Sequence, residues 1–254
     1  RVNIDFNHNV NYRGMYHLDE ALMEGKPAGL KTLGDWPTIY EGLSKLEKQV
    51  QDSWFSFDHF YSDHSFDKAL KIVFAKNPKH LMDVGGNTGR FALRCVEYDS
   101  NVNITIVDLP GQIGMMKENI AGKEGAVRID GFPTNILDEQ NELPQGDWDA
   151  IWMSQFLDCF SEQEIYSILS RAAKAMTADT TLYIMETFWD RQKYEPASLC
   201  LTMTSVYFTV MANGNSKMYH SDDMFKQIER AGLKVVNIHD EIGQGHTILE
   251  VKLK

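Results

Sequence analysis

Apolar positions recur at two different spacings along the chain, and the change between them divides the sequence. From Thr38 to about Tyr61 they return every three or four residues after Pro37, which is the spacing of an amphipathic helix. A second helical pattern runs from about Ser65 to Ala75. The first 35 residues are polar and rich in glycine, and predict irregular structure around one short helix near Leu18–Glu24. We therefore expect an N-terminal helical segment over residues 1–64.

Beyond this segment, short apolar strands alternate with helices. Such alternation predicts a parallel sheet covered on both faces, because right-handed crossovers place helices on each side. Two final strands joined only by a turn predict an antiparallel strand at the edge. The sequence thus predicts an α/β domain over residues 65–254, with a Rossmann-like, seven-stranded, mostly parallel sheet. The expected strands are His80–Val84, Asn103–Val107, Ala126–Asp130, Trp148–Met153, Thr181–Glu186, Lys234–His239 and His246–Lys252, and the expected helices are Arg90–Tyr98, Gly111–Ile120, Ser161–Met176, Ala197–Ala212 and Ser221–Ala231, the last capped by Ser221.

Charge and cysteine content narrow the classes of function. The chain has 36 acidic and 25 basic side chains, a net charge of −11, which disfavours nucleic acid or an anionic membrane as a partner. No apolar run approaches the ~18 residues that a membrane span needs. Cys95, Cys159 and Cys200 are odd in number and widely spaced, which is typical of reduced thiols in a cytoplasmic protein. Because the chain starts at Arg1, we expect that something is missing upstream.

A glycine-rich turn follows the first strand of the α/β pattern. Glycines let a ligand lie against the backbone, and the amides at the following helix start can meet an anionic group. A nicotinamide-binding fingerprint ending at Gly86 and Gly89 would need its first glycine at position 84. That position is Val84, so the turn does not match the nicotinamide-binding fingerprint. It also leaves the ionisable Asp83 unexplained. Asp108 ends the next strand, where a carboxylate can accept hydrogen bonds from both hydroxyls of a ribose.

These residues carry a family resemblance. With Leu81–Gly89, the segment Val107-Asp108-Leu109-Pro110 and Trp148–Glu164, the chain resembles class I S-adenosylmethionine-dependent methyltransferases. Within that class it resembles the O-methyltransferases of the plant caffeate type and of bacterial polyketide synthesis, over roughly Leu18 to Lys254. The resemblance implies methyl transfer from S-adenosylmethionine, leaving S-adenosylhomocysteine and using no metal. Its implied acceptor is a small hydroxylated aromatic or polyene-like metabolite.

The resemblance also implies roles for particular residues. Family members usually carry an upstream helical dimerisation domain, so a homodimer through such a domain is implied. Residues of the glycine turn, of the strand ends and of the N-terminal helix are expected to bind the cofactor, although Tyr61 and Ser62 could equally serve helix packing. The helix Ala197–Ala212 is expected to cover the substrate, although its side chains could equally be core. The cofactor set is Asp83, Gly85, Gly86, Asn87, Gly89, Asp108, Leu109, Asn135, Ile136, Ser154, Gln155, Tyr61 and Ser62; the substrate set is Trp189, Met203, Tyr207 and Met211.

The sequence departs from the family at the general base. The family's catalytic histidine lies in a Leu-His-Asp-Trp-Ser segment, whereas this chain has Leu157-Asp158-Cys159-Phe160-Ser161. An ordinary aspartate has a pKa of about 3.9, against about 6.5 for histidine, and is a weaker base. Burial and a nearby carboxylate would raise its pKa. Glu186 matches the family's acidic residue beside that base, so Asp158 and Glu186 are expected to form a catalytic carboxylate pair.

Several alternatives stay open at this stage. His59, His220 or His246 could replace the missing base. The protein could instead bind S-adenosylmethionine or S-adenosylhomocysteine without turnover, or methylate a ring carbon. A nucleic-acid methyltransferase is disfavoured by the net charge, and because Met153-Ser154-Gln155-Phe156 stands where such enzymes have an Asn-Pro-Pro-aromatic segment.

Overall fold

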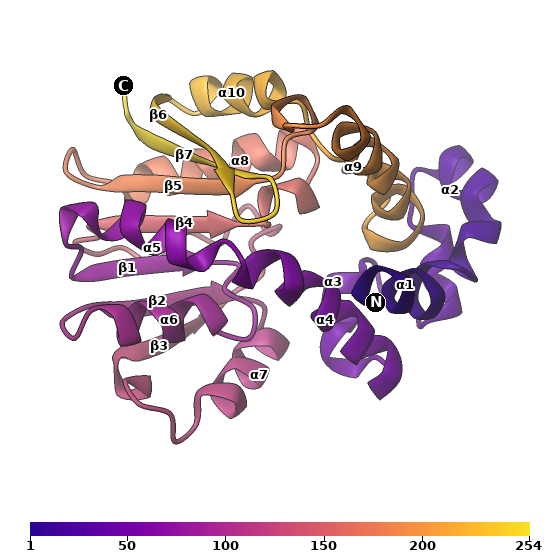
Figure 1. Cartoon of the computed structure of the whole chain (residues 1–254), viewed down its shortest axis with the longest axis horizontal. Coiled ribbons are helices and arrows are strands. Elements are labelled where there is room, and N and C mark those ends of the chain that lie inside the picture. Colours follow the sequence, from indigo (N-terminus) through magenta and orange to yellow (C-terminus); the bar gives the residue numbers. More distant parts are fainter.

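A seven-stranded sheet forms the middle layer of the molecule, with helices on both of its faces (Figure 1). The computed structural model describes residues 1–254. The strand order is β3-β2-β1-β4-β5-β7-β6, and β7 runs antiparallel to both of its neighbours. This confirms the predicted α/β fold with a mostly parallel sheet. The antiparallel strand lies one place inside the edge, because the terminal hairpin pairs its second strand, not its first, with β5.

Most element bounds agree with the periodicity of the sequence. The strands are β1 His80–Val84, β2 Asn103–Asp108, β3 Ile129–Pro133, β4 Ala150–Ser154, β5 Thr181–Glu186, β6 Leu233–Ile242 and β7 His246–Leu253. The α-helices are α1 Val2–Phe6, α2 Leu18–Glu24, α3 Ile39–Gly42, α4 Lys48–Asp63, α5 Phe66–Val73, α6 Arg90–Tyr98, α7 Pro110–Ile120, α8 Glu162–Ala175, α9 Glu195–Tyr207 and α10 Ser221–Arg230.

The single helix predicted over Thr38–Tyr61 is wrong. The backbone leaves the helical region at Leu46 and Glu47, with ψ angles of 149° and 141°, so α3 and α4 are separate helices. Leu43, Leu46 and Val50 nevertheless pack on one hydrophobic core. Their three- to four-residue spacing therefore continues across the break and conceals it.

Two smaller expectations also need correction. The third predicted strand begins with a 3₁₀ turn over Ala126–Arg128, so β3 starts three residues later, at Ile129. His220, not Ser221, caps α10: its Nδ1 accepts a hydrogen bond from the amide of Asp222. The Ser221 hydroxyl donates to Asp190 instead.

The N-terminal segment is more regular than its glycines predict. Besides the expected α2, it contains α1, a π-helical turn over Asn7–Asn11 and 3₁₀ turns over Gly14–His17 and Ala28–Thr32. The glycines at 14 and 29 permit close packing. A Cβ atom at Gly29 would lie 2.6 Å from the carbonyl oxygen of Gly14 and 2.7 Å from Cγ1 of Val210. These glycines therefore serve helix packing and do not mark loops.

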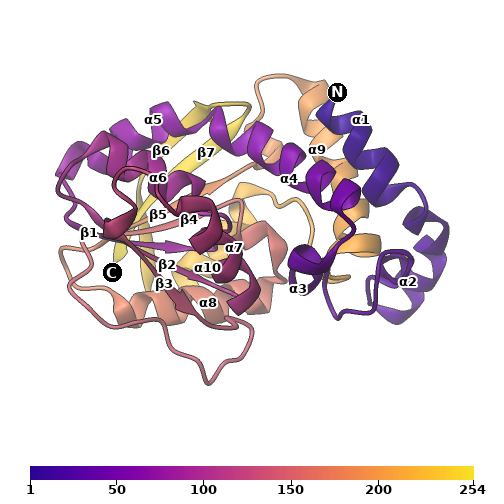
Figure 2. The ribbon, with the colours of Figure 1, turned by 90° about the horizontal axis from the view of Figure 1, so that it is seen from below.

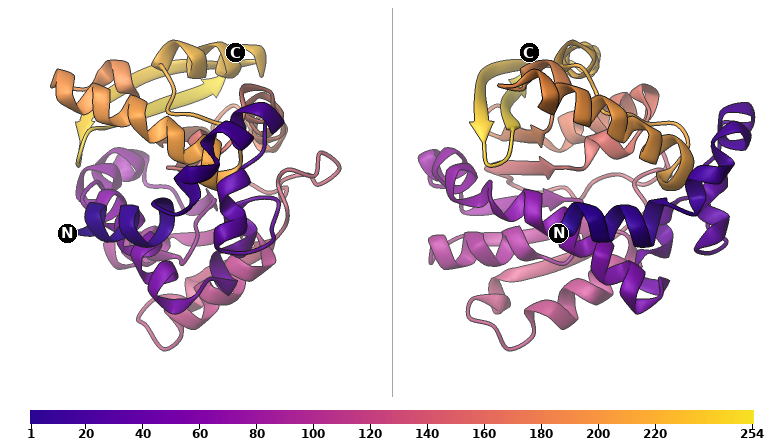
Figure 3. Two further views of the ribbon diagram at one scale, coloured as in Figure 1. Left: turned by 90° about the vertical axis from the view of Figure 1, so that its right-hand side faces the viewer. Right: turned by 45° about the vertical axis from the view of Figure 1, so that its right-hand side comes forward.

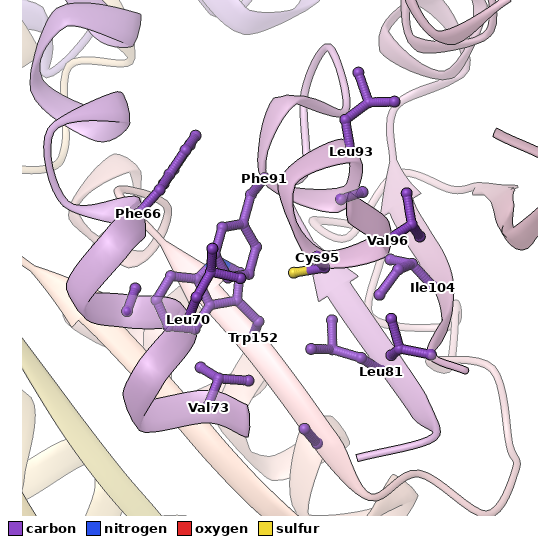
Figure 4. Close-up of a cluster of buried hydrophobic side chains, with 14 of the residues drawn as sticks. Phe66, Leu70, Val73, Leu81, Phe91, Leu93, Cys95, Val96, Ile104 and Trp152 are labelled. Atoms are coloured by element: carbon purple, nitrogen blue, oxygen red, sulfur yellow. The ribbon is translucent and has the colours of Figure 1, made fainter. Parts of the chain in front are cut away.

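Three hydrophobic cores stabilise the fold. Two lie on opposite faces of the sheet, and Figure 4 shows α5 and α6 packing on strand residues, with Phe91 stacked on Trp152 at 4.5 Å. The third joins the N-terminal helices to α9 and to the π-helical turn Phe208–Ala212. Figures 2 and 3 show this helical layer beyond one end of the sheet.

Because the layer contains residues from before and after residue 64, the domain boundary there stays a prediction. None of the helices combines the length and apolar character that crossing a lipid bilayer requires.

The close helix packing can be tested with a pair of glycine substitutions. Gly29→Ala should destabilise the protein by about 1–3 kcal/mol, because the added methyl group meets backbone and buried side chains. Gly114→Ala in α7, where no atom lies within 4 Å of the added carbon, should instead stabilise it by about 0.5–1 kcal/mol. Urea unfolding followed by circular dichroism measures both. Equal effects of the two substitutions would contradict this packing.

Candidate active site

One cavity opens where the carboxyl ends of β1, β2 and β4 meet the N-terminal helices. From β1 the chain builds the sheet toward β3 and then returns to add β4 on the other side. Such a reversal in strand order leaves a crevice beside the strand ends, which is the usual ligand site of open α/β sheets. The cavity holds about 1180 Å³ of space between atoms, including its open mouth.

The glycine turn after β1 forms the floor of the cavity. Gly85 and Asn87 adopt left-handed backbone conformations, with φ of 77° and 50°. A Cβ atom at Gly86 would lie 2.7 Å from Oδ2 of Asp83, so only glycine lets the turn close over that carboxyl group. Gly85, Gly86 and Asn87 line the cavity as expected. Gly89 does not; it faces α7, where a Cβ atom would meet Met116 at 2.9 Å.

Asp83 is a buried carboxyl group without a partner. It is 2% exposed, and its Oδ2 has no hydrogen bond although the residue lines the cavity. Burial, and then the charge of Asp108, raise the pKa of Asp83 to about 8. The free protein therefore keeps this group largely protonated at neutral pH. An unpaired acid in this position is suited to a ligand that brings a positive charge or a hydrogen-bond donor.

Asp108 is held rigidly at the end of β2. Its two carboxylate oxygens accept hydrogen bonds from the amides of Asn87 at 2.8 Å and Leu109 at 2.7 Å. Burial raises its pKa to about 6, against the lowering effect of these two bonds. Each oxygen keeps a free lone pair for the cavity. Leu109, Asn135 and Ile136 line the same end, so the strand-end residues predicted for a nucleoside do lie together.

The inner face of α4 forms the opposite wall. Trp54, Asp58 and Ser62 are four residues apart, share one face of the helix and line the cavity. Tyr61 lies outside the lining, and its hydroxyl donates to Asn3 at 3.0 Å. Sequence reasoning selected Ser62 but missed Asp58 and Trp54. Their spacing of four and eight residues before Ser62 was the available signal.

Gln155, after β4, links this wall to β7. Its Nε2 donates to Oδ1 of Asp58 at 3.3 Å, and its Oε1 lies 2.9 Å from Nε2 of His246 on β7. Its backbone has a positive φ of 47°, held by a bond from its amide to the carbonyl of Met185. Burial, and then Asp158 and Asp63, raise the pKa of Asp58 to about 7. Burial lowers the pKa of His246 to about 4, so its ring is neutral.

Asp158 and Glu186 occupy the expected neighbourhood, but no hydrogen bond joins their carboxyl groups. Oε1 of Glu186 accepts from the amides of Phe156 at 3.0 Å and Leu157 at 2.7 Å, and thereby holds the loop that carries Asp158. Its Oε2 has no partner. Burial, and then Asp158, raise the pKa of Glu186 well above its usual range. Burial raises the pKa of Asp158 to about 6, and the Cys159 thiol lies 3.4 Å from its Oδ1. Cys159, not Asp158, lines the cavity.

The four residues expected around the substrate lie outside the cavity lining. The Tyr207 hydroxyl accepts a hydrogen bond from Nε1 of Trp54 at 2.9 Å, and Met211 is fully buried in the third core. Trp189 packs edge-on against the ring of His220, and Met203 is 60% exposed. The cavity is instead lined by six residues that the sequence did not single out for the substrate: Tyr40, Glu41, Trp54, Phe156, Cys159 and Phe160.

The sheet order, the glycine turn and the strand-end carboxylate together define a methyltransferase-type Rossmann-like domain. The O-methyltransferase domain family matches residues 16–233, and the chain belongs to this family. The resemblance inferred from the sequence is thereby confirmed.

Known relatives share this domain at low identity. The chain is similar to norreticuline-7-O-methyltransferase of Papaver somniferum, with 27% identity over 79% of this chain and 52% of the relative. It is similar to demethylspheroidene O-methyltransferase of Rhodobacter capsulatus, with 22% identity over 80% and 49%. Its fold matches that of the O-methyltransferase NcsB1 from neocarzinostatin biosynthesis, solved with S-adenosylmethionine and 2-hydroxy-5-methyl naphthoic acid, with a TM-score of 0.76, 18% identity and coverage of 95% and 68%. The chain spans about half the length of these two curated relatives.

The raised pKa values of the cavity predict how stability depends on pH. Asp58 and Asp83 have folded-state pKa values of about 7 and 8, above about 3.9 for the unfolded chain. The folded protein therefore binds more protons between these limits, and the free energy of unfolding falls as pH rises through them. The buried His59 and His246, with pKa values lowered to about 4, act oppositely but only below about pH 6.5. The urea midpoint should thus decrease from pH 6.5 to 8.

Asp83→Asn provides the control for this dependence. In this variant the urea midpoint should decrease less between pH 6.5 and 8, because Asp83 has the higher pKa of the two groups and no longer titrates. A wild-type midpoint that stays constant or rises between pH 6.5 and 8 would show that these carboxyls are not buried as the structure has them.

Proposed function

We propose that this protein binds S-adenosylmethionine in the cavity and directs its methyl group to the hydroxyl of a small aromatic or polyene-like metabolite. Asp108 carries the proposal: a strand-end carboxylate held by two backbone amides beside a glycine turn, in a chain of the O-methyltransferase domain family. Bound S-adenosylmethionine supplies a methyl group activated on a positively charged sulfur. We further propose that the protein is cytoplasmic and homodimeric, which its free thiols and its family support respectively.

The residues of the cavity fit this cofactor. Asp108 has free lone pairs for the two ribose hydroxyls, and Leu109 and Ile136 provide apolar surface for an adenine ring. The unpartnered Asp83 can receive an ammonium group close to the glycine turn. The acids of the lining also favour a ligand with a net positive charge.

Asp158 is proposed as the residue that removes the substrate proton. Burial gives its carboxyl a pKa of about 6, close to the value of about 6.5 of an ordinary histidine. A carboxylate with this pKa can take a phenol proton at neutral pH almost as well as the histidine that it replaces. Glu186 would act by positioning, since it bonds to the two amides that precede Asp158. Phe156 and Phe160, on either side of Asp158 in the sequence, line the cavity and help to exclude water.

A calorimetric titration with S-adenosylmethionine and S-adenosylhomocysteine tests the cofactor. Both should bind, and Asp108→Ala should weaken each by about tenfold or more, equivalent to at least about 1.4 kcal/mol. Asp130→Ala, which removes an exposed carboxylate outside the cavity, is the matched control and should leave both affinities unchanged. If neither ligand binds to the wild-type protein, the proposed function is wrong for this chain.

A pair of substitutions at one position tests the base. Asp158→Asn should lower kcat for a phenolic acceptor by about 10²- to 10⁴-fold, because the amide cannot accept the proton, while cofactor affinity stays unchanged. Asp158→His should restore most of the activity. Single-turnover assays and the calorimetric titration measure the two properties separately. Unchanged kcat in Asp158→Asn would assign the proton transfer to another group, and absence of turnover in the wild-type protein would favour a cofactor-binding protein.

A further inference from the structure

The cavity combines aromatic surface with carboxyl groups along α4. Trp54 and Asp58 lie one helical turn apart on the inner face of α4, and both line the cavity. Tyr40 and Phe156 belong to the same lining, and the buried Tyr40 hydroxyl has the Cys159 thiol near it but no oxygen or nitrogen partner. Aromatic faces next to a carboxylate are the combination that binds an ammonium group, through cation–π attraction and a charged hydrogen bond.

Acidic side chains outnumber basic ones around the cavity. Four acids belong to the lining, and Arg90 is its only arginine or lysine. The Arg90 guanidinium already makes two hydrogen bonds to Asp63. Asp158 and Glu186 add two further acids next to Cys159. Burial favours the protonated form of several of these acids, and a cation beside them would favour the ionised form. S-adenosylmethionine brings only one net positive charge, so these acids can accommodate a second cationic group. The four acids of the lining are Glu41, Asp58, Asp83 and Asp108.

Asp58 lies on α4 between the glycine turn and the aromatic part of the cavity. Its neighbour His59 contacts Thr88 of the glycine turn, and the charges of Asp158, Asp63 and Arg90 all act on Asp58. Asp58 also lies one turn from Trp54, whose Nε1 donates to Tyr207. The carboxyl group at position 58 is thus close enough to the proposed base to be influenced by its charge, and one helical turn from the indole ring of Trp54.

Gln155 fixes the orientation of the Asp58 carboxyl group. Its only hydrogen bond in the protein is the one that Oδ1 accepts from Gln155. Gln155 is itself held by His246 and by the carbonyl of Met185. Oδ2 of Asp58 therefore has no protein partner. Oδ2 is therefore available to form an ion pair with a cationic group that lies next to the indole ring of Trp54.

We propose that the methyl acceptor carries a cationic nitrogen, and that Asp58 and Trp54 bind it; the substrate class is that of hydroxylated aromatic amines. The inference rests on the proposed methyl transfer and specifies its acceptor. The ammonium group pairs with Oδ2 of Asp58 against the face of Trp54. The Tyr40 hydroxyl meets a second polar group of the same molecule.

Three phenols of similar shape and different charge test this inference. The protein is first saturated with S-adenosylhomocysteine and then titrated with tyramine, 4-ethylphenol or 4-hydroxyphenylacetate, which are cationic, neutral and anionic. Tyramine should bind at least about tenfold more tightly than 4-ethylphenol, and 4-hydroxyphenylacetate should bind most weakly. Isothermal calorimetry measures all three affinities without relying on turnover.

Two variants of the same helix assign the preference to its residue. Asp58→Asn should reduce the preference for tyramine to about twofold or less, since the amide keeps the shape but not the charge. Asp52→Asn removes an exposed carboxylate of α4 that pairs with Lys48, and should keep the full preference. Both variants should bind S-adenosylhomocysteine as the wild type does. Thermal unfolding confirms that they are folded, and the comparison of the three phenols on the wild-type protein needs no variant.

The outcomes separate this inference from the proposed function. Equal affinities for tyramine and 4-ethylphenol, or no binding of tyramine, would overturn the amine site while leaving cofactor binding intact. A loss of S-adenosylhomocysteine binding in Asp58→Asn would place Asp58 at the cofactor and also overturn it. If S-adenosylhomocysteine does not bind to the wild type, the proposed function fails, and the same three titrations on the free protein then test the acidic site by itself.

Discussion

Burial of carboxyl groups around a single cavity is the constraint on which the site depends. Each buried acid without a counter-charge favours its protonated form, as the raised pKa values of Asp58, Asp83 and Glu186 show. The glycine turn closes over Asp83, the Gln155 side chain holds Asp58, and two backbone amides hold Glu186, so the groups stay in place at this cost. A cationic ligand would relieve the cost, so binding and ionisation are coupled. The same feature that weakens the free protein thus strengthens its complex.

The rigid parts of the site lie one layer behind the cavity. Glu186 does not line the cavity, yet its bonds to two successive amides fix the loop of the proposed base. His246 lies on the antiparallel β7 and acts on α4 only through Gln155. The insertion of β7 beside β5 therefore has a consequence beyond sheet topology. It brings the last strand of the chain close enough to orient a carboxyl group on an N-terminal helix.

The elements predicted from the sequence are those whose signals are local. The glycine turn, the strand-end Asp108 and the strand–helix alternation each follow from a few adjacent residues, and the fold was correctly predicted from them. The break before α4 was not, because Leu43, Leu46 and Val50 face one core on both sides of it. Asp58 was missed because its importance depends on Gln155, which lies 97 positions later in the chain. The spacing of four residues from Ser62 indicates that Asp58 faces the cavity, but its contact with Gln155 is set by packing and leaves no pattern in the neighbouring sequence.

The exchange of the family's histidine for Asp158 illustrates how environment can substitute for residue type. A histidine at this position would be a base because of its intrinsic pKa, and burial would lower that value, as it does at His59 and His246. An aspartate responds to the same burial in the opposite direction, and its pKa rises to about 6. Burial therefore brings the pKa of the aspartate close to the value of about 6.5 of an ordinary, unburied histidine. They differ in charge: the aspartate is anionic when ready to accept a proton, whereas the histidine is neutral. A site that uses aspartate is consequently the more compatible of the two with a positively charged acceptor.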